Sequence, residues 1–472
     1  ITLARTYDVD PEDVVVEGFG TGSDTARQIS LLTGGEWDVF LATTGNRPAD
    51  MESAHGNFRR QSWEKDHETG NDRFLNIRAL MYFRLRRWIK EGGMLDPDKT
   101  LRDQLMTIRY RVAQMKDRIK LMPKKKMRKE KPNVVFILSD DMSWGDMGCY
   151  GQDKISTPNL DQLANGGTTF SAAYAGAPVC APARSTIMQG KHLGRATVRN
   201  NMISPGDGVQ YRHSLRDSDV TMAHQFKKAG YATGMFGKWG LALKGQSGLP
   251  GEMGFDHFFG YLNQRKAHSY YPPYLWENDK KVKLPENEGH DHKKANEYDV
   301  SGRCLVNGVK DPLGASYSFD LCHEKALEFV KHQQKNPFFL YLPVTIPHAA
   351  YEVPELGEYT DLDWPLVHKI YAAMITRFDS AVGELVEELK NQGVYENTLI
   401  VFASDNGYSH KDKGSTEMTL DEFFRHSGPF KGRKANLNQG GVRVPALAHW
   451  PARIPAGANC DYPWAFFDLL PT

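Results

Sequence analysis

Short runs of consecutive apolar residues alternate with longer segments of helical periodicity in the second part of the chain. The clearest runs, at residues 133–138, 338–342 and 398–403, are rich in branched and aromatic side chains. Such runs are typical of strands that are buried on both faces of a sheet. Residues 366–390 carry apolar side chains near helical spacing and predict a crossover helix facing the core. The pattern predicts an α/β domain with a central, mostly parallel mixed sheet flanked by helices.

The first part of the chain has a different pattern. Residues 13–17 predict a buried strand that runs into the glycine turn at 18–22. Residues 74–90 place apolar side chains on one face and precede two glycines, which predicts an amphipathic helix. Lysine and arginine then crowd residues 116–131, a run typical of a solvated linker. We therefore expect three parts, namely residues 1–115, a basic linker at 116–131 and a large domain at 132–472.

Composition limits the partners. The 472 residues carry a net charge of +1, so no overall charge favours nucleic acid or an anionic membrane, and no nucleic-acid partner is expected. No stretch approaches the roughly 18 consecutive apolar residues of a membrane span, so no membrane partner is expected either. The five scattered cysteines argue against a disulfide framework or a zinc site, with a Cys304–Cys322 pair as the remaining alternative. Ile1 follows no signal peptide or initiator methionine, so we expect the natural start to lie upstream.

Acidic side chains follow two of the predicted strands in the same way. Asp140 and Asp141 come directly after one strand, and Asp405 and Asn406 come after another. Parallel strands end at one edge of a sheet, where open α/β folds bind their ligands. Three carboxylates and an amide oxygen there predict an all-oxygen cation site that suits calcium or magnesium. The alternative is that each Ser-Asp-Asx motif only caps the turn after its strand.

Residues 180–184, Cys-Ala-Pro-Ala-Arg, resemble the signature of the type I sulfatases, in which the cysteine becomes formylglycine. Without this resemblance, an ordinary buried thiol is an alternative interpretation of Cys180 in a Pro-rich turn before a helix, although a helix N-terminus favours an anion. Other segments that resemble the family follow in its chain order. They are residues 157–161, 229–233, 236–239, 347–349 and Lys434 with 439–445.

The resemblance implies an alkaline-phosphatase-like fold and hydrolysis of a sulfate ester, carried by a carbohydrate or an aryl group. It implies that a formylglycine-generating enzyme modifies Cys180, and that the hydrated aldehyde attacks sulfur and later releases sulfate by elimination. Ca²⁺ would be held by Asp140, Asp141, Asp405, Asn406 and the modified Cys180. Arg184, Lys238 and Lys434 would stabilise the sulfuryl oxygens, and His348 would protonate the departing alcohol. Bacterial members are mostly exported, which implies a periplasmic or extracellular location.

The chain departs from the family at two places. Many members have a histidine two residues after the lysine that corresponds to Lys238. This chain has Gly240 at that position, and His268 is a candidate replacement. The sequence stops at Thr472, where sulfatases usually continue into a smaller C-terminal subdomain, so we expect that subdomain to be missing.

The substrate loops are rich in aromatic residues. Tyr270, Tyr271, Tyr274 and Trp276 either stack on a sugar ring or pack against the neighbouring prolines.

Residues 73–79, 88–93 and 101–110 resemble the nuclease domain of phage large terminase subunits, over about residues 1–130. That resemblance implies a partial ribonuclease-H-like α/β segment. Such nucleases need carboxylates from several strands to hold two metal ions, and only Glu17 is a candidate here. We therefore predict no nuclease activity.

Two other functional interpretations stay open. A phosphatase or phosphodiesterase of the same superfamily would use an unmodified Thr or Ser with histidine-rich zinc ligands, which Cys180 and an all-oxygen site do not fit. Alternatively, the polypeptide is a catalytically inactive fusion of a terminase fragment with a truncated sulfatase.

Overall fold

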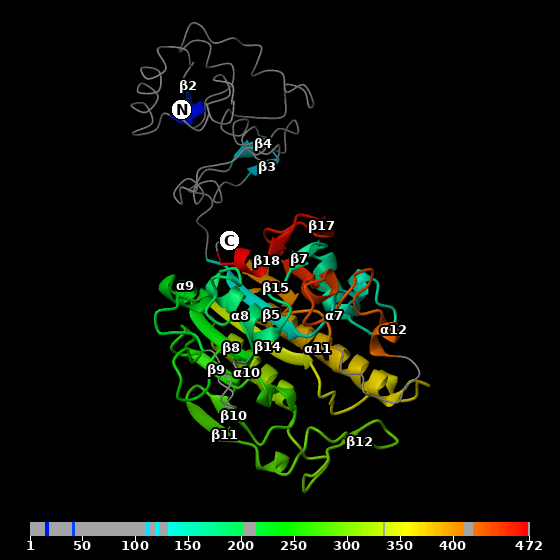
Figure 1. Ribbon diagram of the computed structural model, residues 1–472. Helices are drawn as coiled ribbons and strands as arrows, with labels where there is room; N and C mark the ends of the chain where they lie inside the picture. The colour runs from blue at the N-terminus through cyan, green and yellow to red at the C-terminus, as the bar shows by residue number, and fades with distance from the viewer. Residues whose placement is uncertain are drawn as a thin grey trace. The chain divides into compact units, whose positions relative to one another are not determined.

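The computed structural model divides the chain into two compact units, Ile1–Lys129 and Glu130–Thr472. It describes residues 131–201, 214–333, 336–409 and 419–470, together with four short strands of the first unit (Figure 1). Each unit is considered by itself.

The described strands of the first unit form two pairs. β1 (Val15–Glu17) lies parallel to β2 (Phe40–Ala42), and β3 (Tyr110–Val112) lies antiparallel to β4 (Ile119–Leu121). β1 falls within the strand expected at 13–17, and β4 falls within the segment expected as a linker. The helix expected at 74–90 lies outside the described residues.

A ten-stranded sheet forms the centre of the second unit, in the order β11-β10-β9-β8-β14-β5-β15-β16-β6-β17. The five neighbouring strands from β9 to β15 are parallel to one another, and antiparallel pairs flank them. The prediction of a mostly parallel mixed sheet is therefore confirmed. The strands of this sheet are β5 (Asn133–Asp140), β6 (Thr168–Phe170), β8 (Ala232–Lys238), β9 (His257–Tyr261), β10 (Tyr274–Glu277), β11 (Lys280–Lys283), β14 (Phe338–Pro347), β15 (Thr398–Ser404), β16 (Ala446–His449) and β17 (Ala458–Cys460).

Helices cover both faces of this sheet (Figure 1). The three predicted strand runs are β5, β14 and β15, and the predicted crossover helix is α11, so these expectations are confirmed. Two small pairs, β7 (Ala173–Tyr174) with β18 (Trp464–Ala465) and β12 (Glu297–Tyr298) with β13 (Cys304–Leu305), lie apart from the sheet. The described helices are α7 (Pro158–Asn165), α8 (Cys180–Gln189), α9 (Met222–Lys228), α10 (Ser318–His332), α11 (Leu366–Asn391), α12 (Leu420–Phe424) and α13 (Gln439–Val442).

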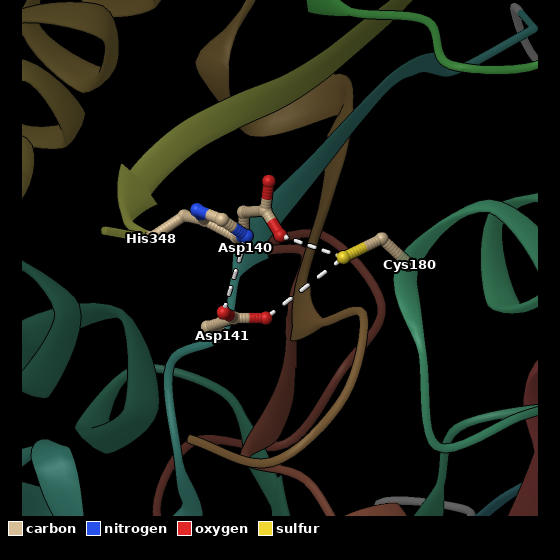
Figure 2. Close-up of side chains that lie close together, drawn as sticks. All are labelled: Asp140, Asp141, Cys180 and His348. Carbon is tan, nitrogen blue, oxygen red and sulfur yellow. Dashed lines mark hydrogen bonds and ion pairs between the residues drawn. The ribbon is translucent and has the colours of Figure 1, made fainter. Parts of the chain in front are cut away.

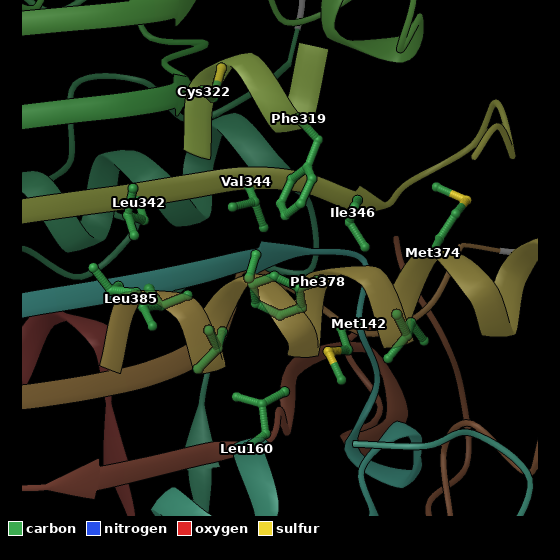
Figure 3. Close-up of a cluster of buried hydrophobic side chains, with 14 of the residues drawn as sticks. Met142, Leu160, Phe319, Cys322, Leu342, Val344, Ile346, Met374, Phe378 and Leu385 are labelled. Carbon is green, nitrogen blue, oxygen red and sulfur yellow. The ribbon is translucent and has the colours of Figure 1, made fainter. Parts of the chain in front are cut away.

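Successive side chains of the central strands enter two different apolar clusters, because neighbouring residues of a strand point to opposite faces. Leu342 and Val344 of β14 pack with Phe378 of α11 on one face (Figure 3). Phe339 and Tyr341 of the same strand pack on the other face, in the cluster that contains α8 and α9 side chains. Burial on both faces explains why the strands read as continuous apolar runs.

Among the described residues, no helix has the length and apolar character needed to cross a bilayer. All five cysteines are free thiols, so the Cys304–Cys322 alternative is not realised.

Candidate active site

The two acidic motifs meet at one edge of the sheet. β5 and β15 are parallel neighbours, and Ser404 is directly opposite Ser139. Asp140 ends β5, and its neighbour Asp141 turns away from the strand with a φ of 69°. The backbone N–H of Asp141 donates to Asp405 Oδ1 over 3.3 Å. The expected convergence of the two strand ends is thus observed.

Cys180 begins helix α8 and faces these carboxylates (Figure 2). Its Sγ atom lies 3.3 Å from Asp140 Oδ1 and 3.9 Å from Asp141 Oδ1. Cys180 is a free thiol here, so these distances are those of its sulfur atom. Asn201 Oδ1 accepts the N–H of Ala181 over 3.1 Å and so satisfies a donor in the first turn of the helix.

Three cationic side chains surround the same point. Lys434 Nζ lies 3.0 Å from Cys180 Sγ and 2.5 Å from Asp141 Oδ1. Lys238, at the end of β8, donates to Asp140 Oδ2. The guanidinium of Arg184, one turn along α8, lies 3.0 Å from Asp405 Oδ2 and 3.6 Å from Asp140 Oδ2. Arg184 and Lys238 are almost wholly buried, which is unusual for such side chains unless they are paired with charge.

His348 completes the group from the residue after β14. Its Nδ1 lies against the carbonyl of Ala349, which can only accept a hydrogen bond, so Nδ1–H is the donor, and its Nε2 lies 3.5 Å from Asp141 Oδ2. His268 stacks on His348 with ring centroids 4.2 Å apart. Nε2 is therefore the ring atom of His348 that faces the site.

Burial and mutual charge set the protonation of these groups. Burial opposes ionisation of Asp140, but the charges of Lys238, His348, Arg184 and Lys434 outweigh it and hold the pKa of Asp140 well below its usual value. Burial and the charge of Asp140 raise the pKa of Asp405 to about 7. Burial and Asp140 also raise the pKa of the Cys180 thiol. Burial and Lys434 lower the pKa of His348 well below its usual value.

The oxygen atoms at this edge fit a calcium ion. Asp141 Oδ2 and Asn406 Oδ1 are buried and have no hydrogen-bond partner among the described residues. Buried polar atoms without partners are costly and often mark the place of an ion. Ligand atoms of Asp140, Asp141, Cys180 and His348 lie within 4.8 Å of one another. Carboxylate and amide oxygens are the donors that calcium prefers.

Gly240 and Gln264 occupy the place where the family resemblance would put a histidine. Gly240 has a φ of 73°, which side-chain-bearing residues rarely adopt, and a Cβ there would lie 2.3 Å from Gln264 Oε1. A histidine at position 240 would thus require rearrangement. The ring of His268, the candidate replacement, stacks on the ring of His348.

Several contributing residues were not found from the sequence. Asp146 accepts hydrogen bonds from the backbone N–H of Ser143 at 2.7 Å and from Tyr371 at 3.0 Å, and it pairs with His426 Nδ1 at 2.5 Å. This buried network ties the turn after Asp141 to the segment that leads to Lys434. Asp146 is 225 residues from Tyr371 and 280 residues from His426, so no local pattern could have indicated these two contacts.

For two of the four aromatic residues, the structure favours packing over stacking on a sugar ring. Tyr270 and Tyr271 are buried in the core, and the Tyr270 hydroxyl donates to the carbonyls of Thr345 and His348. Tyr270 therefore supports the turn that carries His348. Tyr274 and Trp276 are half-buried on β10.

Comparisons with known proteins agree with this geometry. The model of the family described as Sulfatase matches residues 132–472. N-acetylgalactosamine-6-sulfatase of Rattus norvegicus is 30% identical over 355 residues, covering 72% of this chain and 61% of that protein. Arylsulfatase G of Mus musculus is 31% identical over 372 residues, covering 74% of this chain and 65% of that protein. The chain thus spans less than two thirds of the length of these two relatives.

Among solved structures, Ps i-CgsB in complex with k-i-k-neocarrahexaose is similar, with a TM-score of 0.57 and 29% identity. The match covers 72% of this chain and 71% of that one. The expected alkaline-phosphatase-like sulfatase fold is confirmed for the second unit. Residues 1–131 lie outside the matched family segment, so the resemblance to a terminase nuclease stays a prediction.

Proposed function

Because this chain belongs to the sulfatase family, we propose that its second unit hydrolyses a sulfate ester of a carbohydrate or an aryl alcohol. The observation that carries the proposal is the position of Cys180 Sγ, between the carboxylate of Asp140 and the ammonium of Lys434. A side chain at this point meets both the candidate cation ligands and the groups that attract an anion.

Two groups complete the chemistry. Calcium, held by Asp140, Asp141, Asp405 and Asn406, would supply a positive charge that favours ionisation of a neighbouring hydroxyl. Formylglycine at position 180 would supply the nucleophilic oxygen and a route for releasing sulfate that an unmodified thiol lacks.

The chain's own cations would bind the sulfate group. Lys434 already contacts Sγ, and Arg184 and Lys238 lie against Oδ2 of Asp140, whose Oδ1 faces Sγ. A sulfuryl group transferred to residue 180 would thus meet fixed positive charges, which stabilise the charge on its oxygens in the transition state. The burial of Arg184 and Lys238 strengthens this effect, since water screens them little.

His348 would supply the proton for the leaving alcohol. Its Nδ1 is engaged by the Ala349 carbonyl, so Nε2 is the atom that exchanges a proton with the substrate. An anionic sulfate beside the ring favours the protonated form and offsets the burial that lowers its pKa. His268, stacked on this ring, would hold it in position and is our candidate for the role of the histidine absent at position 240.

The proposed substrate class is a sulfated carbohydrate. It rests on relatives named N-acetylgalactosamine-6-sulfatase and on a similar structure in complex with k-i-k-neocarrahexaose. A formylglycine-generating enzyme is the maturation partner, and export to the periplasm or beyond is the location that this substrate class favours.

The test begins with protein co-expressed with a formylglycine-generating enzyme. Peptide mass spectrometry should find formylglycine at position 180, and the protein should hydrolyse p-nitrophenyl sulfate in the presence of calcium. Cys180→Ala should abolish turnover with an unchanged circular dichroism spectrum, whereas Cys460→Ala, a half-buried thiol outside the site, should keep it. Full activity in Cys180→Ala would overturn the proposal, and modification without turnover would favour an inactive polypeptide.

A further inference from the structure

A cationic face lies on the hairpin at one end of the ten-stranded sheet. β10 and β11 pair antiparallel, with Tyr274 opposite Lys283 and Trp276 opposite Lys281. Directly opposed residues point to the same face of a sheet, so these four side chains share one surface. Lys244, from the loop after β8, reaches the same surface with its Nζ 5.9 Å from the centre of the Trp276 ring. We call these five residues the hairpin face.

Aromatic rings lie against two of the three lysines of the hairpin face, Lys244 and Lys281. Lys281 Nζ lies 4.2 Å from the centre of the Tyr274 ring and 5.8 Å from that of Trp276. Lys244 also donates to the carbonyl of Asp279 over 3.3 Å. A lysine fixed in this way loses less conformational entropy when it binds an anion than a free surface lysine does.

The lysines of the hairpin face are exposed and lack carboxylate partners. Within the described residues, no ion pair joins Lys244, Lys281 or Lys283 to an acidic side chain. The hairpin itself carries two acids. Glu277 lies on the opposite face of β10, 3.5 Å from Lys325, and the exposed Asp279 lies in the turn, where its backbone carbonyl accepts from Lys244. Lys244, Lys281 and Lys283 are therefore exposed positive charges that an anion can approach, and the first two lie on half-buried rings.

The hairpin face lies on the same sheet as the candidate active site. Lys238 ends β8, and β9, β10 and β11 follow it in order towards the sheet edge. Lys238 is opposite Tyr261 of β9, and β10 and β11 place Tyr274 and Lys283 towards that same end. At about 4.8 Å between strands, β11 lies roughly 14 Å from β8. A chain molecule that reaches the active site could also reach this face.

We infer that the hairpin face is a secondary binding site for a sulfated polysaccharide, which holds the polymer while one of its sulfate groups enters the active site. The inference rests on the proposed function, since it takes the polymer to be the substrate. Positive charges on a mixed aromatic surface complement sulfate groups on sugar rings. Because Lys281 already lies over Tyr274, the rings position the lysine, and the contact to the polymer is made chiefly by ammonium groups.

Edge lysines have another known use, because they discourage pairing with a strand of another molecule. That role needs charge on β11 but neither the rings beneath it nor Lys244 from a separate loop. The two roles can be separated by measuring polymer binding and aggregation in the same variants.

The experiment measures binding of dextran sulfate to the full chain, with unsulfated dextran and a single-stranded DNA oligonucleotide as comparison probes. The test variant is Lys281→Gln/Lys283→Gln, and Lys293→Gln/Lys294→Gln removes the same charge from two exposed lysines elsewhere. The hairpin variant should bind dextran sulfate about tenfold more weakly, while the control variant should bind like the parent. Hydrolysis of p-nitrophenyl sulfate, which is too small to reach β11, should be unchanged in both.

Tyr274→Leu, which keeps all lysines but removes a ring, should also weaken binding, by a smaller factor. Equal binding by the hairpin variant and the parent, or equal loss in the control variant, would overturn the inference. Equally strong binding of DNA by the hairpin face would overturn its assignment to a sulfated glycan. If the parent protein hydrolyses no sulfate ester but the hairpin variant still binds dextran sulfate more weakly than the parent, the proposed function fails while the inferred binding site remains supported.

Discussion

The ammonium of Lys434 lies 3.0 Å from Sγ of Cys180, although 254 residues separate them in the sequence. The same ammonium is 2.5 Å from Asp141 Oδ1, so one cation links Cys180 to a candidate calcium ligand. Burial would lower the pKa of Lys434, but the charges of Asp141 and Cys180 outweigh it and raise the pKa well above its usual value. Lys434 is thus a fixed positive charge at the candidate active site.

Lys434→Gln should lower kcat for p-nitrophenyl sulfate by about a hundredfold, because a fixed charge beside the transferring group is lost. Lys431→Gln removes an exposed charge three residues away and should leave kcat unchanged. Steady-state kinetics on both modified proteins would check this. A Lys434→Gln enzyme with the parent's kcat would show that the lysine only neutralises Asp141.

His348→Gln should reduce activity most with substrates whose alcohol leaves poorly. We expect a loss of about a hundredfold with a sugar sulfate, which needs a proton on the leaving oxygen. The loss should be much smaller with p-nitrophenyl sulfate, whose leaving group is stable as an anion. His323→Gln alters a histidine that pairs with Glu384 on α11, and should affect neither substrate. Equal losses with both substrates would contradict a role for His348 as the acid.

Calcium should raise the melting temperature of the protein, because it binds the folded site only. At a free concentration about a hundred times Kd, the added stability is roughly 2.7 kcal/mol, or a shift of several degrees. Asn406→Ala removes one of the two unpartnered oxygens and should reduce the calcium-dependent shift, whereas Asn165→Ala, at an exposed helix end, should retain it. Differential scanning calorimetry with calcium, magnesium or chelator would measure it. No shift in the parent protein would argue against the site.

The free energy of unfolding should decrease as the pH rises through the folded-state pKa of His290. Its Nε2 lies 2.8 Å from Glu352 Oε1; burial would lower the pKa of His290, but the hydrogen bond and charge of Glu352 outweigh it and raise the pKa. Because the pKa of His290 is raised in the folded state, its protonated form stabilises the fold. This contribution to stability is complete below the pKa of the unfolded state, about 6.5, and is lost as the pH rises through the pKa of the folded state.

Chemical unfolding across this pH range would measure the effect. His290→Gln should be less stable than the parent at low pH, by about 1–3 kcal/mol, because Glu352 loses a buried partner, and its stability should change less with pH. The neighbouring exposed substitution His292→Gln should keep the parent's profile. If the parent protein became more stable as the pH rose through this range, the stabilising role of protonated His290 would be contradicted.

The sequence by itself determined the central strands, the long helix α11 and the two acidic strand ends. These follow from local patterns, because strands buried on both faces need continuous apolar runs and parallel strands end at one edge. The motif at residues 180–184 indicated the family and, through it, the residues expected at the site. The structure brings Cys180, Arg184, Lys238, His348 and Lys434 to that edge.

Only the tertiary structure decided which side chains share a surface. Tyr270 and Tyr274 are four residues apart in one aromatic segment, yet the first is buried beneath His348 and the second lies under Lys281 at the sheet edge. The pairing of Asp146 with His426 and the closeness of Gln264 to Gly240 likewise depend on segments that meet only after folding. Local sequence encodes the periodicity of each element, whereas burial and contact between distant side chains arise from how the elements pack.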